Sequence, residues 1–495
     1  MINRMLTACA IICVIAPALH ATGAGAAAPS NAAALTWSPC KDVPDTECAG
    51  LSVPLDPAKP DGAKLTLRLA RVPAQDQAHK KGVIVFLPGG PGAGIASVFG
   101  GDNRKEQHID ELSRRWDLAV FDPRGVGESS PIRCSPQAVP SPAAPSLQPP
   151  GRPYYANVAR VNAAYFKTCF DESGELMRHL SAADTAADVE QIRRALTPND
   201  GLIAYGGSYG SAYGQAYLER FPTHVKAMVL DGVLDHSIDF PTFMARNVRS
   251  VDDEFDRMVR WCASSPSCAL HGTDVGAAYD ALARAHAEFI PVVSQLLAAG
   301  SDPNFGWPAL AKMLAAANTG DTAGFEEMRK ATSIAAVATD AHVVAGKSGL
   351  FSGVICSDYG PQSDYDALVA GGRAVSNEAP RFAWKYWDYT PILRASAGVG
   401  DCVGWPIAAT YPPHKLRVGL HPNVMVANPT HDPATPLANA VSVWLQIPQA
   451  RLLVADSDGH QSWIVSKCAF EAEARFLEDP TNYPSVTLCP LEAQP

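Results

Sequence analysis

The chain has 495 residues, 47% of them hydrophobic and 18% charged, and a formal net charge of −10 at pH 7. This composition is that of a globular protein with a large core, and it excludes an intrinsically disordered chain. The acidic balance argues against a nucleic acid as partner, because phosphate binding calls for a basic surface.

The first 28 residues have the pattern of a secretory signal peptide. Arg4 precedes an apolar stretch over residues 5–19, and small residues suited to cleavage follow between Ala21 and Ala28. The apolar stretch is too short for a membrane span. The sequence "LTAC" at residues 6–9 is similar to a lipid-attachment motif, but its Cys9 lies before most of the apolar stretch rather than after it. We therefore expect no membrane anchor. We therefore predict an exported protein, either extracellular or periplasmic.

The use of cysteine agrees with export. Of the twelve cysteines, Cys9 and Cys13 lie in the signal segment, and an even number remains in the mature chain, which indicates disulfides. The spacing leaves the connectivity open but favours bonds between neighbours in sequence: Cys40–Cys48, Cys134–Cys169, Cys262–Cys268, Cys356–Cys402 and Cys468–Cys489. The zinc-binding spacings C-x-x-C and H-E-x-x-H do not occur, so no metal is expected.

Short apolar runs typical of buried strands recur along the chain. They cover residues 65–72, 82–90, 116–125, 202–207, 225–233, 423–432 and 450–460. Helical stretches such as Asp184–Leu196 separate them, and this alternation predicts an α/β fold with a mostly parallel sheet and helices on both faces.

The strand pattern fades in the middle of the chain, where alanine- and leucine-rich helical stretches replace it. We predict a helical cap over residues 236–400, inserted between an N-terminal core part (29–235) and a C-terminal core part (401–495). The proline-rich stretch 137–153 is predicted to be a surface loop.

The stretch "LIAYGGSYG" at residues 202–210 has the pattern of a nucleophile elbow. An apolar strand runs into Gly206, Ser208 and Gly210, which match G-x-S-x-G, and a helical pattern with small residues follows. In such a turn the serine is held in a strained conformation that lifts its Oγ clear of the sheet. A capped, glycine-rich helix start is the alternative, but it leaves Gly206 and Gly207 unexplained.

A serine hydroxyl needs a base and a carboxylate, which in this kind of sheet follow the serine at strand ends, acid first. Asp432 closes one predicted strand and His460 closes the next. His431 is the nearest rival base, but it precedes the acid. Asp456 and Asp458 compete for the acid, although they share the loop of His460. We predict a triad of Ser208, Asp432 and His460.

Two backbone N–H groups must be in place to bind the oxyanion of an acyl-transfer reaction. We predict that Tyr209, the residue after the nucleophile, supplies one of them. The loop "FLPGGPGAG" at residues 86–94 is predicted to supply the other, because Gly89 and Gly90 let the backbone approach the substrate. A phosphate-binding loop would need G-x-x-x-x-G-K-[ST] or a complete G-x-G-x-x-G. Neither occurs, so no nucleotide or other cofactor is expected.

An ordered set of motifs, taken together, resembles the secreted tripeptidyl-aminopeptidase and prolyl-aminopeptidase group of α/β-hydrolases. The motifs extend through nearly all of the mature chain: "WSPC", "CAGLSVPLD", "PGGPGAG", "FDPRGVGESSPIRC", "YGGSYG", "VLDGVLD", "ICSDYG", "CVGWP", "HDPATP" and "DGHQS". The resemblance implies an α/β-hydrolase fold, the triad above, and an exported serine exopeptidase that releases tripeptides or single residues from free N-termini. Pro88 stands where the prolyl branch has histidine, which favours the tripeptidyl branch.

An aminopeptidase must also hold the α-amine of its substrate, which calls for a carboxylate in or near the cap. Asp358 is the candidate, whereas Asp122 and Arg124 are predicted to be structural. An exported carboxylesterase or small-amide hydrolase with the same triad is the alternative function. A binding protein on an inactive scaffold would have lost a site residue, and an epoxide hydrolase or dehalogenase would need aspartate at position 208. The sequence gives no prediction of oligomeric state.

Overall fold

The computed structural model describes residues 35–136, 151–300, 302, 305–331, 341–387 and 398–491. The predicted signal peptide and most of the predicted proline-rich loop lie outside the described residues. Arg152 and Pro153, which we placed in that loop, instead begin a helix, α4 (Arg152–Ser173). Proline fits there because the first turn of a helix needs no N–H from it.

A single sheet runs through the described part of the chain. Its strands are β1 (Ser38–Pro39), β2 (Glu47–Pro54), β3 (Lys64–Val72), β4 (Val83–Leu87), β5 (Asp117–Phe121), β6 (Leu202–Gly207), β7 (Val225–Asp231), β8 (Val424–His431), β9 (Arg451–Asp458) and β10 (Val486–Cys489). The spatial order is β1-β2-β3-β5-β4-β6-β7-β8-β9-β10. In this order the neighbouring pairs from β5 to β10 are parallel, whereas the pairs β1–β2, β2–β3 and β3–β5 are antiparallel.

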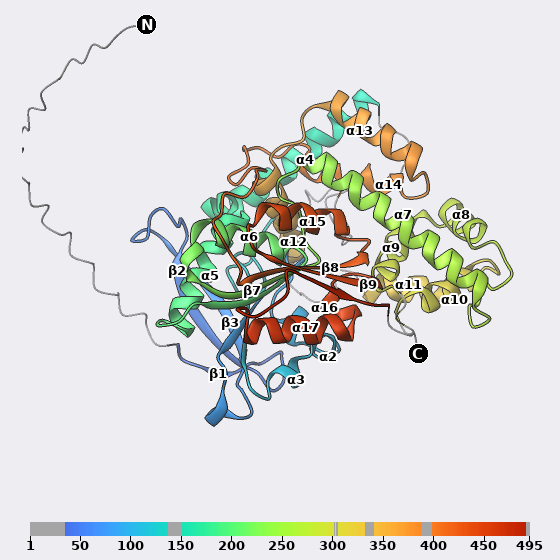
Figure 1. Ribbon diagram of the computed structural model, residues 1–495. Coiled ribbons are helices and arrows are strands. Elements are labelled where there is room, and N and C mark those ends of the chain that lie inside the picture. The colour runs from blue at the N-terminus through green and yellow to red at the C-terminus, as the bar shows by residue number, and fades with distance from the viewer. Residues whose placement is uncertain are drawn as a thin grey trace, which may run out of the picture. The chain divides into compact units, whose positions relative to one another are not determined.

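The sheet is covered on both faces, as predicted (Figure 1). Side chains alternate between two hydrophobic cores, because successive residues of a strand point to opposite faces. In β4, for example, Val85 and Leu87 join one core and Ile84 and Phe86 the other. The first core includes side chains of α5 (Ala182–Leu196), α6 (Gly210–Arg220) and α15 (Leu437–Gln446). The second includes side chains of α1 (Ala96–Phe99), α3 (Ile109–Leu112), α16 (Ser462–Val465) and α17 (Lys467–Glu478).

The described residues between β7 and β8, where the cap is predicted, form helices and loops and contain no strand. They are α7 (Phe240–Ser264), α8 (Val275–Ala285), α9 (Ile290–Ala298), α10 (Trp307–Ala317), α11 (Ala323–Ala331), α12 (Ala341–Tyr359), α13 (Tyr365–Glu378) and α14 (Ala383–Tyr386). The boundaries at 236 and 400 stay a prediction, since Leu35–Pro495 forms one compact unit. We call α7 to α14 the helical insertion.

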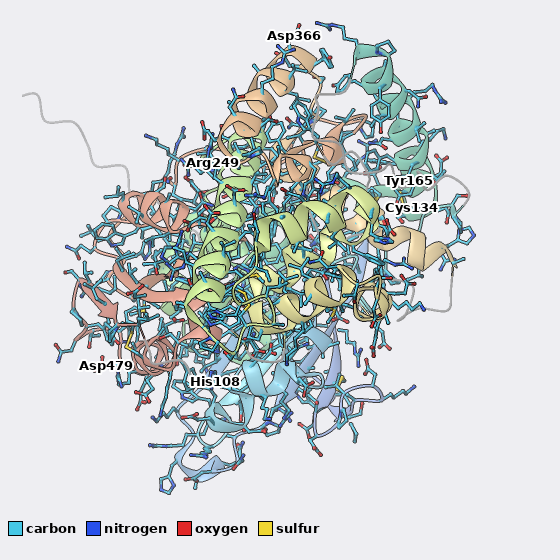
Figure 2. The ribbon with its side chains drawn as sticks, turned by 90° about the vertical axis from the view of Figure 1, so that its right-hand side faces the viewer. His108, Cys134, Tyr165, Arg249, Asp366 and Asp479 are labelled. Carbon is cyan, nitrogen blue, oxygen red and sulfur yellow. A yellow bond between two sulfur atoms is a disulfide. The ribbon has the colours of Figure 1, made fainter. Side chains whose placement is uncertain are left out.

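Helix α4 lies against the helical insertion although it precedes the nucleophile in sequence (Figure 1). Arg152 pairs with Asp366 of α13 at 2.5 Å, a residue labelled in Figure 2. The ring of Tyr155 lies 5.3 Å from that of Tyr365, and its hydroxyl donates to the carbonyl of Gln362. The helical layer over the sheet therefore draws on two separate parts of the chain.

The disulfides have the predicted pairing of neighbours. They join Cys40–Cys48, Cys134–Cys169, Cys262–Cys268, Cys356–Cys402 and Cys468–Cys489. Figure 2 shows Cys134 close to Tyr165 of α4, and a Cβ added to Gly349 of α12 would touch the sulfurs of this bond. The Cys134–Cys169 disulfide thus fastens α4 at the point where α12 packs on it. No helix in the described residues is long and apolar enough to cross a membrane.

Candidate active site

Ser208 occupies a sharp turn between β6 and α6. Its φ is 55°, a left-handed value that costs free energy for a residue with a side chain. Its N–H donates to the carbonyl of Asp231 at 2.9 Å, which ties the turn to the end of β7. Ser208 is partly exposed, while its neighbours Gly207 and Tyr209 are buried. The turn therefore presents the serine at the carboxyl end of the sheet, as a nucleophile elbow does.

The glycines of the elbow are there because side chains would not fit. A Cβ on Gly206 would lie 2.7 Å from the carbonyl oxygen of Gly210. Gly89, in the loop after β4, lies directly against the nucleophile: a Cβ there would be 2.9 Å from Cβ of Ser208 and 3.0 Å from the carbonyl oxygen of Gly207. The predicted oxyanion loop and the predicted nucleophile are thus in contact.

Asp432 and His460 form a hydrogen-bonded pair at the ends of β8 and β9. Nδ1 of His460 lies 2.8 Å from Oδ2 and 2.9 Å from Oδ1 of Asp432. The carboxylate is fully buried and also accepts the N–H groups of Ala434 and Thr435, at 2.8 Å each. These donors fix its orientation. With Nδ1 facing a carboxylate, Nε2 of His460 is left to act as the base.

The end of β7 contacts both the predicted nucleophile and the predicted base. Asp231 accepts the N–H of Ser208, and a Cβ on Gly232, the next residue, would lie 3.0 Å from Cε1 of His460. Burial alone lowers the pKa of His460, but the charge and hydrogen bond of Asp432 outweigh it, so the pKa lies above its ordinary value. The imidazole is about one-fifth exposed, which leaves it open to a substrate.

The rival residues have other partners. His431 lies 2.9 Å from Asp253. Asp458 pairs with Arg257 of the helical insertion. Asp456 is exposed and accepts only a long hydrogen bond, 3.3 Å, from the hydroxyl of Thr430 among the contacts described. None of these three is placed like Asp432 or His460.

The two charged residues of the "DPRG" motif bind other segments of the chain. Asp122 accepts the N–H groups of Ile95 and Glu128, at 2.8 and 3.2 Å. Arg124 is buried and forms a two-pronged ion pair with Asp188 of α5, at 2.7 and 2.8 Å. Asp122 and Arg124 thus each tie separate segments of the chain together, in agreement with the structural role predicted for this motif.

Asp358 lies at the end of α12, away from solvent. Its exposed fraction is 0%. Oδ2 accepts the hydroxyl of Tyr209 at 2.6 Å, and Oδ1 accepts the N–H of Ala182 at 2.9 Å. Binding of the substrate amine by Asp358 stays a prediction, and neither oxygen faces solvent in this conformation. The link to Tyr209, the residue after the nucleophile, is a feature that the sequence did not indicate.

The helical insertion contacts both loops that carry the acid and the base. The hydroxyl of Ser250 in α7 donates to the carbonyl of Asp432 at 2.6 Å. The N–H of His460 donates to the carbonyl of Ala298, at the end of α9, at 2.9 Å. A cavity of about 110 Å³ opens beside these contacts. Its lining comprises Val251, Pro291, Ser294, Gln295, Ala298, Lys385, Pro433 and Ala434. No sequence pattern marked these contacts, because they join residues far apart in the chain.

Fold and site together define a serine hydrolase of the α/β-hydrolase class. The family model for the alpha/beta hydrolase fold matches residues 82–338, and that for a TAP-like protein matches residues 393–489. The chain belongs to the α/β-hydrolase fold family, and the predicted resemblance to its peptidase group is confirmed.

Three curated relatives align over most of their length. "Carboxylesterase B" of Mycobacterium tuberculosis is 31% identical, and the alignment covers 96% of this chain and 94% of the relative. "Serine protease Hip1" of the same species is 29% identical, over 92% of this chain and 90% of its own. "Tripeptidyl aminopeptidase" of Streptomyces lividans is 27% identical, over 94% and 88%. The family thus includes enzymes named for peptide and for ester substrates.

Proposed function

We propose that the protein is an exported serine exopeptidase that removes tripeptides or single residues from free N-termini. The observation that carries this proposal is that Ser208, held at φ 55°, and the hydrogen-bonded Asp432–His460 pair follow strands of one parallel sheet, with the helical insertion in contact with the acid and base loops. The tripeptidyl aminopeptidase and serine protease relatives support peptides as substrates. The disulfides support export, because such bonds persist in oxidising compartments.

The proposed reaction passes through an acyl-enzyme. Nε2 of His460 takes the proton of Ser208 as Oγ bonds to the carbonyl carbon of the substrate. The N–H of Tyr209 and an N–H of the loop containing Gly89 and Gly90 bind the oxyanion. The imidazolium then gives its proton to the leaving amine as the C–N bond breaks. Water, deprotonated by His460, repeats the sequence on the ester and frees Ser208.

Cleavage of a peptide differs from cleavage of an ester in the leaving group. An amine must be protonated as it leaves, whereas an alkoxide or phenolate is a better leaving group without that help. The raised pKa of His460 favours its imidazolium form at the moment when this proton is needed. A carboxylesterase remains the second candidate, because the relative named carboxylesterase B shares 31% identity over nearly the whole chain.

Preference for a free N-terminus requires a carboxyl group facing the amine. Besides Asp358, Glu254 of α7 is a candidate. It is fully buried, with Oε1 accepting the indole N–H of Trp307 at 3.0 Å, and Oε2 has no hydrogen-bond partner among the described residues. Burial and the nearby Asp458 raise the pKa of Glu254 well above its usual range, against the opposing effect of Arg257. An ammonium group would satisfy Oε2 and draw the carboxyl into its charged form.

The test uses the purified mature protein and four matched chromogenic substrates. These are a free-amine tripeptide anilide, its N-acetylated twin, a proline anilide and a short-chain nitrophenyl ester, with Ser208→Ala as control. We expect turnover of the free tripeptide, a strong loss on acetylation, and no activity in the control. Fast ester turnover with indifference to the free amine would leave the carboxylesterase. Absence of any turnover, with Ser208 inert to a fluorophosphonate, would overturn the assignment to serine hydrolases of both kinds.

A further inference from the structure

Tyr209 acts at the site through its backbone and is anchored through its side chain. It directly follows Ser208 and caps the N-terminus of α6, so its N–H is the one expected to face the oxyanion. Its side chain turns into the protein, where it is 2% exposed, and its hydroxyl donates to Oδ2 of Asp358 at 2.6 Å. The orientation of the elbow is thereby tied to a residue 149 positions away.

Asp358 joins three helices through one carboxyl group. It belongs to the last turn of α12, its Oδ2 faces Tyr209 at the start of α6, and its Oδ1 accepts the N–H of Ala182 at 2.9 Å, the first residue of α5. Figure 1 shows these three helices together on the same side of the sheet. Helices α5 and α6 pack against each other and precede β7 in the chain. Helix α12 belongs to the helical insertion.

The end of α12 is itself held from the other side. The disulfide Cys356–Cys402 fastens it two residues before Asp358. The carbonyl of Ser357 accepts the N–H of Thr410 at 2.8 Å. Gln362, just beyond the helix, donates its N–H to the carbonyl of Cys402 at 3.0 Å. Asp358 is therefore a fixed point against which Tyr209 is positioned.

The elbow needs such a fixed point for two reasons. A serine at φ 55° stores strain, and strained backbone persists only where its surroundings over-determine it. An oxyanion donor also has to be in place before the reaction, because a displacement of about 0.5–1 Å loses much of its contribution. The ring of Tyr209 cannot shift without breaking the bond to Asp358, so the adjoining N–H is held as well.

We propose that Asp358 is a positioning residue which, through the hydroxyl of Tyr209, fixes the N–H of Tyr209 in the oxyanion hole. Oxyanion stabilisation then depends on the placement of α12, so the helical insertion contributes to the chemical step as well as to substrate entry. This inference rests on the proposed function only in assuming an acyl-transfer reaction at Ser208. It applies equally to peptide and ester substrates, and it gives Asp358 a role other than binding the substrate amine.

The test compares Asp358→Asn, Tyr209→Phe and the double variant with the wild-type chain. Tyr213→Phe is the matched control, since Tyr213 is another buried tyrosine of α6 whose ring lies 5.6 Å from that of Tyr209. Initial rates on the tripeptide anilide and the nitrophenyl ester give kcat and KM separately, and the rate of phosphonylation of Ser208 by a fluorophosphonate is measured without any peptide. Folding is checked by near-ultraviolet circular dichroism.

We expect each single variant to lower kcat and the phosphonylation rate by about ten-fold or more on both substrates, with KM nearly unchanged. The double variant should lose no more than the worse single variant, because both break the same link. Tyr213→Phe should match the wild type. Unchanged kcat in a folded Tyr209→Phe, additive losses, or a change confined to KM for free-amine substrates would overturn the inference. If Asp358→Asn fails to fold, Tyr209→Phe carries the test, because it removes one oxygen only.

The same measurements separate this inference from the proposed function. A wild-type enzyme that is phosphonylated and cleaves the ester but not the tripeptide would overturn the aminopeptidase, and the variants would still report on positioning. A wild type that cleaves the tripeptide while Asp358→Asn and Tyr209→Phe are fully active would uphold the peptidase and sink the positioning role.

Discussion

Substitution of Asp358 by asparagine should stabilise the fold while it slows the reaction. Burial raises the pKa of Asp358 from 3.8 to about 8, although the hydrogen bonds of Tyr209 and Ala182 oppose the shift. The folded protein thus keeps this proton at pH values where the unfolded chain has lost it. The contribution of this protonated carboxyl to stability is therefore complete below about pH 4 and is lost as the pH rises toward 8, because ionisation stabilises the unfolded state.

The size of this effect follows from the two pKa values. The ordinary pKa of 3.8 lies about three pH units below pH 7. At about 1.4 kcal/mol per unit, ionisation of the unfolded chain lowers the free energy of unfolding of the wild type by about 4 kcal/mol at pH 7. Asparagine does not ionise, but it loses one good hydrogen bond, worth about 1–2 kcal/mol. We therefore expect Asp358→Asn to be about 2–3 kcal/mol more stable than the wild type at pH 7, and about 1–2 kcal/mol less stable near pH 4.

Urea unfolding with intact disulfides, at about pH 4, 5.5 and 7, measures this difference as a shift of the midpoint. Asp366→Asn is the control, because Asp366 is exposed and pairs with the exposed Arg152. A stability difference that does not change with pH would refute the buried, protonated state of Asp358. A variant that is both less stable at pH 7 and fully active would refute the positioning role together with it.

Three further predictions concern the site. Because the pKa of His460 lies above its ordinary value of 6.5, the acid limb of kcat/KM should have its midpoint above pH 6.5, and a midpoint below that value would contradict the Asp432–His460 geometry. Gly89→Ala places a Cβ 2.9 Å from Cβ of Ser208 and should lower kcat by about ten-fold or more, while Gly419→Ala, with open space around its Cβ, should leave it unchanged. Glu254→Gln should raise KM for the free-amine tripeptide by about ten-fold or more and leave the KM for the ester unaffected. The control is Glu326→Gln, because Glu326 is partly exposed and pairs with Arg329 on the surface of α11. Equal effects on both substrates would exclude amine binding by Glu254.

The candidate catalytic residues could be named from the sequence because their signals are local. A strand, a glycine-flanked serine and a helix stand together in residues 202–220, and the structure has β6, the turn and α6 in that order. Asp432 and His460 each follow an apolar run that forms a strand, so parallel topology alone brings them to one edge of the sheet. The antiparallel strands β1 and β2 were missed. They form an edge hairpin whose half-exposed residues lack a continuous apolar run.

The positioning role proposed for Asp358 could not be predicted from the sequence, because its partners are distant along the chain. Tyr209 and Ala182 lie 149 and 176 residues from it, and no spacing rule connects them. From the sequence we named Asp358 as a carboxylate near the cap that could hold the substrate amine, whereas folding places it in a buried junction of helices. The packing of α4 on α13 escaped prediction for the same reason, since Arg152 and Asp366 are 214 residues apart.

The helical insertion touches each of the three predicted catalytic elements. It meets the acid loop through Ser250, the base loop through Ala298, and the elbow through Asp358. A lid that only screened the entrance would need none of these contacts. Three different helices of the insertion instead make hydrogen bonds to the site, so the geometry of the site depends on where the insertion lies. A substrate that shifts the insertion on entering would therefore also shift the candidate catalytic residues. The proposed selection for chain ends and the proposed acylation of Ser208 would then depend on the same packing, and changes in the insertion should appear in kcat as well as in KM.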